Sequence, residues 1–179
     1  MKEIVAKAKR GDEEAFTVLY EFYFAPIYRY VFTHIGSKID ADDLTQDIFV
    51  KILESFSRYE ETSSPPLAFF YTIARNTVID WHRKKKTQPL DEGIENILRD
   101  PALDPEAEAI GGEEQKEILS LVSRLSPDQR DAIILKYVND MSNKEIAEIM
   151  GKSEETVRKI QSRGFAVLRT MIKKGDLKK

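Results

Sequence analysis

An acidic segment rich in proline and glycine divides the 179-residue chain into two parts. Residues 89–114 carry one basic and nine acidic side chains, a net charge of −8, with three of the seven prolines and three of the eight glycines. Proline and glycine interrupt regular structure, and clustered carboxylates repel one another. We therefore expect a domain at residues 1–88, an extended flexible linker at residues 89–114 and a second domain at residues 115–179.

The charges of these three parts leave two interpretations of the linker. Residues 1–88 have no net charge and residues 115–179 carry +5, although the whole chain carries −3. The segment between them is either a solvated spacer or an acidic strip that competes with nucleic acid for a basic surface.

Composition limits each domain to a small helical core. The chain is 41% hydrophobic and 33% charged, and the alternation typical of strands is scarce. Because it has no cysteine, a disulfide scaffold, a thiol nucleophile and a cysteine-based zinc site are excluded. No apolar run approaches the ~20 residues that cross a bilayer, and the charged N-terminus lacks the pattern of a secretion signal. We expect an all-α protein of the cytoplasm, without metal or other cofactor.

Helical spacing of apolar residues predicts three helices in the first domain. One covers residues 16–35, where Pro26 predicts a kink or a break near Ala25. A second begins with Asp40 as its cap, and a third covers residues 67–86. The inner faces of the second and third helices are expected to comprise Leu44, Ile48, Ile52, Leu53, Phe70, Ile73, Ala74, Thr77 and Trp81.

The third helix ends in a basic run beside the only tryptophan of the chain. Residues 83–86 read RKKK and follow Trp81 closely. Basic side chains bind phosphates and aromatic rings stack on unpaired bases, at about 1–3 kcal/mol per base, so this pattern suits single-stranded nucleic acid. Alternatively, Phe70, Tyr71 and Trp81 belong to the core, and the basic run is a solvated helix end that the helix dipole favours.

The second domain has the pattern of a helix-turn-helix. Residues 126–129 (SPDQ) and 142–145 (SNKE) are capping boxes, Gly151 suits a turn with positive φ, and Ser153 caps a further helix. An αα-hairpin without a DNA role is the alternative. In the helix-turn-helix interpretation, the outward positions of the last helix, which can enter a major groove, are Thr156, Arg158, Lys159, Gln161, Ser162 and Arg163.

Taken in this order, the segments resemble the extracytoplasmic-function (ECF, group IV) sigma factors of bacterial RNA polymerase, over nearly the whole chain. The region-two helix that docks on the polymerase clamp helices is similar to residues 41–56, ADDLTQDIFVKILESF. The segment that melts and reads the minus-ten promoter element is similar to residues 68–86, AFFYTIARNTVIDWHRKKK. Region four, which reads the minus-thirty-five element, is similar to residues 125–169, LSPDQRDAIILKYVNDMSNKEIAEIMGKSEETVRKIQSRGFAVLR.

The resemblance implies roles for individual residues. Residues at or near the polymerase contact would be Asp43, Leu44, Gln46, Asp47 and Phe49. Single-stranded minus-ten DNA would be bound by the loop at residues 59–66 and the helix after it, with Tyr59, Ser63, Ser64, Asn76, Asp80, Trp81, Arg83 and Lys84. The minus-thirty-five element would be bound by Thr156, Arg158, Lys159, Ser162 and Arg163.

The resemblance also implies the partners. These are bacterial core RNA polymerase, through its clamp helices and flap, promoter DNA in duplex and single-stranded form, and an anti-sigma factor, often membrane-anchored. The linker would pass through polymerase towards the RNA exit path, and no small molecule would be a substrate. The sequence departs from the family pattern at Phe69, where tryptophan is frequent, at Thr72, where arginine is frequent, and at Gly164-Phe165, which replaces a more basic stretch.

Two other functions are less consistent with the sequence. A stand-alone helix-turn-helix regulator with an N-terminal helical interaction domain would bind operators without polymerase, but residues 42–47 and 81–86 favour the sigma factor. An enzyme is not expected, because His34 and His82 are the only histidines, and no phosphate-binding loop, catalytic triad or metal-ligand spacing is visible. We expect no added C-terminal domain, since the chain stops soon after Lys174.

Overall fold

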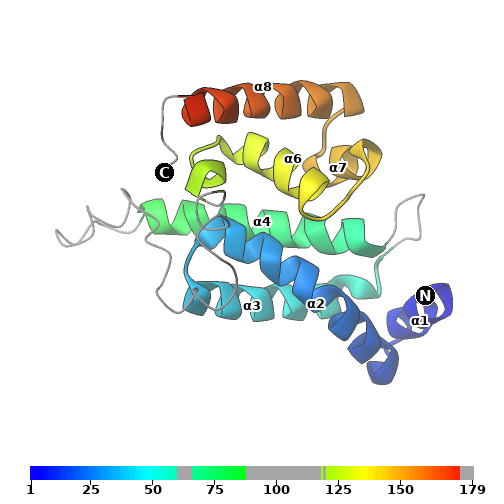
Figure 1. The fold of residues 1–179 in the computed structure, drawn as a ribbon. Helices are drawn as coiled ribbons and strands as arrows, with labels where there is room; N and C mark the ends of the chain where they lie inside the picture. The colour runs from blue at the N-terminus through cyan, green and yellow to red at the C-terminus, as the bar shows by residue number, and fades with distance from the viewer. Residues whose placement is uncertain (60–65, 88–117, 119, 174–179) are drawn as a thin grey trace. The chain divides into compact units, whose positions relative to one another are not determined.

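The computed structural model describes residues 1–59, 66–87, 118 and 120–173 (Figure 1). These residues form α-helices and contain no strand, which confirms the all-α fold class. They divide into two compact units, one formed by α1 to α4 and the other by α6 to α8. The linker predicted at residues 89–114 lies outside the described residues.

Among the described residues of the N-terminal unit, the helices are α1 (Lys2–Lys9), α2 (Glu13–Ile35), α3 (Lys38–Phe56) and α4 (Pro66–Thr87). Helix α1 packs against the beginning of α2 (Figure 1).

One predicted helix start in this unit is wrong, and the break considered at Pro26 does not occur. Helix α2 continues through Pro26, and buried residues on both sides of it, such as Tyr23 and Ile27, anchor the helix to the core. Helix α3 begins two residues before Asp40, which therefore lies in the first turn and is not the cap. A carboxylate is favoured in that turn by the helix dipole.

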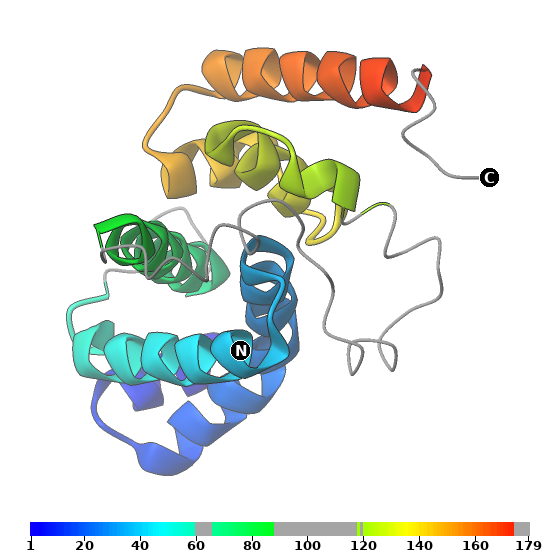
Figure 2. The same ribbon diagram turned by 90° about the vertical axis from the view of Figure 1, so that its left-hand side faces the viewer.

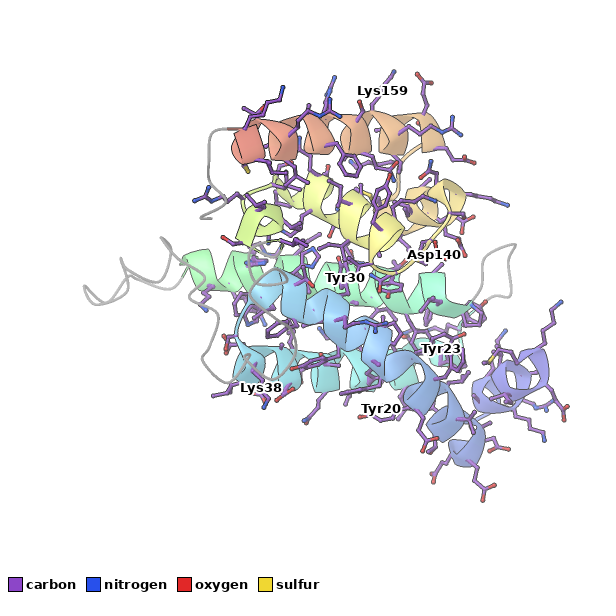
Figure 3. The ribbon with its side chains drawn as sticks, viewed as in Figure 1. Tyr20, Tyr23, Tyr30, Lys38, Asp140 and Lys159 are labelled. Atoms are coloured by element: carbon purple, nitrogen blue, oxygen red, sulfur yellow. The ribbon has the colours of Figure 1, made fainter. Side chains whose placement is uncertain are left out.

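Aromatic side chains form the core between α2, α3 and α4. Phe70 of α4 is fully buried, and its ring centroid lies 4.9 Å from that of Tyr23, 6.0 Å from that of Phe49 and 5.8 Å from that of Phe56. Tyr23 and Tyr30 lie on the side of α2 that faces α4 (Figure 3). Aromatic pairs at such distances add stability beyond the area that they bury.

Tyr71 fixes the register between α4 and α2. Its hydroxyl donates to the carbonyl oxygen of Pro26 at 3.3 Å, and its ring meets that of Tyr30 edge to face at 5.4 Å. Burial raises the pKa of Tyr71, against a smaller opposing effect of Arg29, so the hydroxyl stays protonated and able to donate. The expectation that Phe70 and Tyr71 belong to the core is therefore confirmed.

The C-terminal unit contains α6 (Pro127–Tyr137), α7 (Asn143–Met150) and α8 (Glu154–Lys173). The predicted capping at Ser142 is confirmed: the amide of Glu145 donates to Ser142 Oγ at 3.2 Å, and the amide of Ser142 donates to Glu145 Oε2 at 2.7 Å. Gly151 has the expected positive φ of 62° after α7. Helix α8 then lies along α6 and α7 (Figure 2).

A glycine permits the close approach of α8 to α6. A Cβ atom on Gly164 would lie 2.8 Å from Cδ1 of Ile133 and 3.4 Å from Cβ of Gln129. The departure from the family pattern at Gly164 is therefore explained by helix packing, because a side chain at this position would collide with α6. The following residue, Phe165, places its ring 5.1 Å from that of Tyr137 on α6.

We expect Gly164→Ala to lower the free energy of unfolding, by about 1–3 kcal/mol for an overpacked contact, although alanine has the better helix propensity. Urea unfolding followed by circular dichroism measures this change. Ile133→Val removes Cδ1, so the double variant should be more stable than the sum of the two single changes predicts. A Gly164→Ala protein more stable than the wild type would show that the helices move apart freely.

Candidate functional site

Helix α3 presents an exposed surface opposite its buried face. This surface, the α3 stripe, consists of Asp43, Gln46, Asp47, Val50 and Leu53. Val50 and Leu53 are 54% and 55% exposed, so the stripe combines two apolar side chains with two carboxylates and an amide. The prediction that Leu53 belongs to the core is therefore wrong, and the apolar spacing does not single out Val50. A helix turns by about 100° per residue, so Ile52 faces inward while its neighbour faces outward.

Two residues expected at the polymerase contact are part of the core instead of the exposed surface. Leu44 is 7% exposed and Phe49 is 4% exposed. The ring of Phe49 packs against Tyr20 of α2 at 4.7 Å and against Phe70 of α4. In this conformation Leu44 and Phe49 hold α3 in place, and Asp43, Gln46 and Asp47 are the predicted contact residues that reach the surface.

Asp42 connects α3 to α2. The pKa of Tyr28 is raised to about 12. Burial of the phenol is the largest cause, and the charge of Asp42 and a hydrogen bond to its carboxylate add to it. The phenol therefore stays protonated at neutral pH and donates to the carboxylate. Tyr28 also stacks between Phe24 and Phe32 along α2.

An open groove of about 370 Å³ lies between α3 and α4. The end of α3 contributes Lys51, Glu54 and Ser55, the turn after it contributes Arg58, and α4 contributes Ile73, Asn76, Thr77 and Asp80. The ammonium group of Lys51 donates to Thr77 Oγ1 at 3.1 Å across the groove. The groove thus brings the predicted site residues Asn76 and Asp80 beside Lys51 and Arg58. Sequence reasoning missed both cations, because only the packing of the helices reveals this proximity.

The end of α4 combines an aromatic ring with cations. Trp81 is half-buried, and the ammonium group of Lys85 lies 4.3 Å from the centroid of its ring. Arg83 pairs with Asp80 at 3.0 Å, and Lys85 also lies 3.7 Å from a carboxylate oxygen of Asp40 on α3. Lys84 is exposed. The tryptophan therefore belongs partly to the fold and partly to the surface.

The tyrosine predicted to bind DNA at the end of α3 is buried. Tyr59 is 4% exposed, and its ring is parallel to that of Phe56 at 5.5 Å and meets that of Phe69 at 5.2 Å. A base cannot reach the ring of Tyr59 while these contacts persist. Phe69 fills the place where tryptophan is frequent in the family. Ser63 and Ser64, which were also predicted to bind DNA, lie outside the described residues.

Helix α8 carries the predicted duplex-binding residues on one exposed face. The side chains of Thr156, Arg158, Lys159, Ser162 and Arg163 are all exposed. Lys159 projects from the side of α8 that faces away from α6 (Figure 3).

The outward position expected for Gln161 is wrong. Its Nε2 donates to Asn143 Oδ1 at 3.0 Å and to the carbonyl oxygen of Ala132 at 3.4 Å. Gln161 follows the fully buried Val157 by four residues, so both lie on the same helix face. Its buried amide joins α8 to α6 and α7.

Acidic residues of the first turn of α8 pair with its cations. Arg158 lies 3.1 Å from Glu154, and Lys159 lies 2.6 Å from Glu155. Exposed pairs of this kind contribute about 0–1 kcal/mol, so a phosphate can replace the carboxylate at little cost. Within the described ranges, no cluster of histidine, aspartate and glutamate has the arrangement of a metal site. A search of the same ranges finds no helix that is long and apolar enough to span a membrane.

Comparison with known proteins identifies the family. The Sigma-70 region 2 family matches residues 19–88, and the Sigma-70, region 4 family matches residues 115–168. The ECF RNA polymerase sigma factor SigX of Bacillus subtilis (strain 168) is 32% identical over 163 residues, which cover 88% of this chain and 83% of SigX. SigW of the same organism, also an ECF sigma factor, is 30% identical over an alignment of 186 residues, which covers 97% of this chain and 97% of SigW.

Solved structures show the same fold. CnrH, in its complex with the cytosolic domain of CnrY, superposes with a TM-score of 0.73 at 20% identity, over 95% of both chains. The sigma factor RpoE of Bartonella quintana, in complex with the anti-sigma factor NepR, superposes with a TM-score of 0.70 at 22% identity, over 88% of this chain and 96% of RpoE.

The chain belongs to the ECF sigma factors of RNA polymerase. It is an alternative sigma factor, a protein that directs RNA polymerase to promoters. The prediction made from the ordered motifs is thus confirmed, and it is favoured over the stand-alone regulator.

Proposed function

We propose that the two units divide promoter recognition between them. The domain at residues 1–88 binds core polymerase through the α3 stripe and binds unpaired minus-ten DNA along the groove and the end of α4. The domain at residues 115–179 binds the minus-thirty-five duplex through α8. Residues 89–114 connect the two. The protein catalyses no covalent step and acts in the cytoplasm.

One observation carries the proposal for the first domain: α3 contributes to two surfaces at once. The groove residues Lys51 and Ser55 lie roughly 100° and 140° around the helix axis from Val50, on the side of α3 towards α4. A protein bound at Val50 and Leu53 therefore leaves this side of the groove accessible, so polymerase and DNA can be held together. Val50 and Leu53 beside carboxylates and an amide also resemble a protein interface, in which apolar anchors are surrounded by a polar rim.

The groove and the end of α4 have the chemistry that unpaired DNA requires. Lys51 and Arg58 can bind phosphates, Asn76 can donate to or accept from base edges, and the Asp80 carboxylate can accept from them. Trp81 offers a ring on which a base can stack. Extruding a base from the duplex costs a few kcal/mol of stacking, which such contacts offset.

A protein that covers the α3 stripe would keep the sigma factor inactive. RpoE and CnrH were both solved with a second protein, an anti-sigma factor in the case of RpoE. We propose an anti-sigma factor as a partner of this chain too, in competition with polymerase for the exposed apolar residues of α3.

The proposed function is tested by pull-down of bacterial core RNA polymerase with the purified chain, followed by run-off transcription on genomic fragments. We expect stoichiometric binding and new transcription start sites that need the protein. Retention of duplex DNA without any polymerase binding would instead indicate a stand-alone regulator.

We expect Val50→Asp to weaken binding to core polymerase by at least about ten-fold, because it places a charge among the apolar anchors of an interface. Asp43→Arg combined with Gln46→Ala should weaken binding in the same direction. Affinity is measured by fluorescence anisotropy of labelled sigma factor. Val18→Asp, at another exposed aliphatic residue of the same unit, is the control. If the Val18 and Val50 variants weakened binding equally, the α3 stripe would not be part of the polymerase interface.

We expect Arg158→Ala with Lys159→Ala to weaken promoter binding by the polymerase holoenzyme. The slope of log affinity against log salt should fall by about 0.9 for each phosphate that the variant no longer binds. Lys2→Ala with Lys7→Ala removes the same charge from α1 and should leave the slope unchanged. A wild-type slope and promoter preference in the α8 variant would mean that its side chains face away from DNA.

A further inference from the structure

Lys85 is held from two sides in the N-terminal unit. Its ammonium group lies 4.3 Å from the centroid of the Trp81 ring, one helical turn earlier on α4. The same group lies 3.7 Å from Asp40 Oδ2 on α3. The two side chains of this ion pair are 48% and 41% exposed. A cation over an indole face is attracted by the ring quadrupole, and the carboxylate keeps the cation there.

The packing of α3 against α4 brings these three residues together. Asp40 lies in the first turn of α3, and Lys85 lies in the last part of α4. A second contact between the two helices, the hydrogen bond from Lys51 to Thr77, shows the same antiparallel arrangement. Lys51 follows Asp40 by eleven residues on α3, and Thr77 precedes Lys85 by eight residues on α4. The packing of the two helices therefore places Asp40 within reach of the ammonium group of Lys85.

We propose that Asp40 is a positioning residue that keeps Lys85 over Trp81 until an unpaired base displaces it. The inference rests on the proposed role of Trp81 in binding single-stranded DNA. A base that stacks on the indole needs the face that Lys85 covers. Stacking of a base on an aromatic ring is stronger than an exposed cation–π contact, so an unpaired base can displace Lys85 from the Trp81 ring.

Once displaced from the ring, Lys85 can contribute to DNA binding itself. Released from Trp81, the ammonium group of Lys85 stays on the same helix turn and can bind a phosphate beside the stacked base. Paired bases cannot stack on the ring, so duplex DNA leaves Lys85 in place. Asp40 thus lowers the affinity for unpaired DNA and leaves the affinity for duplex DNA unchanged, although it contacts neither.

The test uses the full chain and its single tryptophan, whose emission reports on Trp81 alone. Asp40→Asn keeps the size of the side chain but removes the charge that holds Lys85. We expect acrylamide to quench Trp81 more strongly in this variant. We also expect labelled single-stranded oligo(dT) to bind about two- to five-fold more tightly, the factor that an exposed cation–π contact represents. The gain should be absent for oligo(dT) annealed to oligo(dA).

Two control variants separate positioning from net charge. Glu14→Gln removes the same charge from the exposed start of α2 and should leave acrylamide quenching unchanged. In a Lys85→Met background, Asp40→Asn should have no further effect on quenching or on oligo(dT) affinity. An equal gain in affinity with or without Lys85 would overturn the proposal, because the effect would then come from net charge.

The same measurements distinguish failure of this inference from failure of the proposed function. If oligo(dT) leaves Trp81 emission unchanged in every variant, Trp81 is not a stacking surface, and both the proposed function of α4 and the positioning role are contradicted. If oligo(dT) quenches Trp81 but Asp40→Asn alters neither acrylamide quenching nor affinity, only the positioning role is contradicted.

Discussion

The contacts of Phe70 with aromatic rings of α2 and α3 are the interaction on which the N-terminal unit depends. Phe70 meets Tyr23, Phe49 and Phe56, and all four side chains are buried. Large, rigid rings fix the rotation of each helix about its own axis as well as its distance from the others. Because the rotation of α3 is fixed, Val50 is turned outward to form the polymerase-facing stripe that we propose. Lys51 is turned towards α4 for the same reason.

The proposed binding surfaces border the core closely, so several residues expected to bind partners turn out to support the fold. Phe49 and Tyr59 are packed against aromatic neighbours, and Gln161 joins three helices with its amide. A helix that binds a partner on one face must be anchored by the other. Residues of both kinds therefore alternate within one motif, and a motif alone does not separate them.

The cations of the proposed DNA surfaces pair with nearby carboxylates. Arg83, Arg158 and Lys159 each pair with an acidic residue three or four positions earlier, and Lys85 pairs across to α3. Such exposed pairs are weak and screened by salt, so phosphates can replace the carboxylates. The carboxylates that pair with Arg158 and Lys159 also lower the net charge of the α8 surface, which limits attachment to DNA that offers only a phosphate backbone.

The sequence by itself determined the all-α class, the helix-turn-helix with its caps at Ser142 and Ser153, and the family. Each of these depends on local signals: caps, glycines and the spacing of apolar residues along one helix. Only the tertiary structure decided that α2 passes through Pro26, that Leu53 is exposed, and that Asp40 lies beside Lys85. These features depend on helix rotation and on contacts between residues far apart in the chain, which the periodicity of a single helix does not specify.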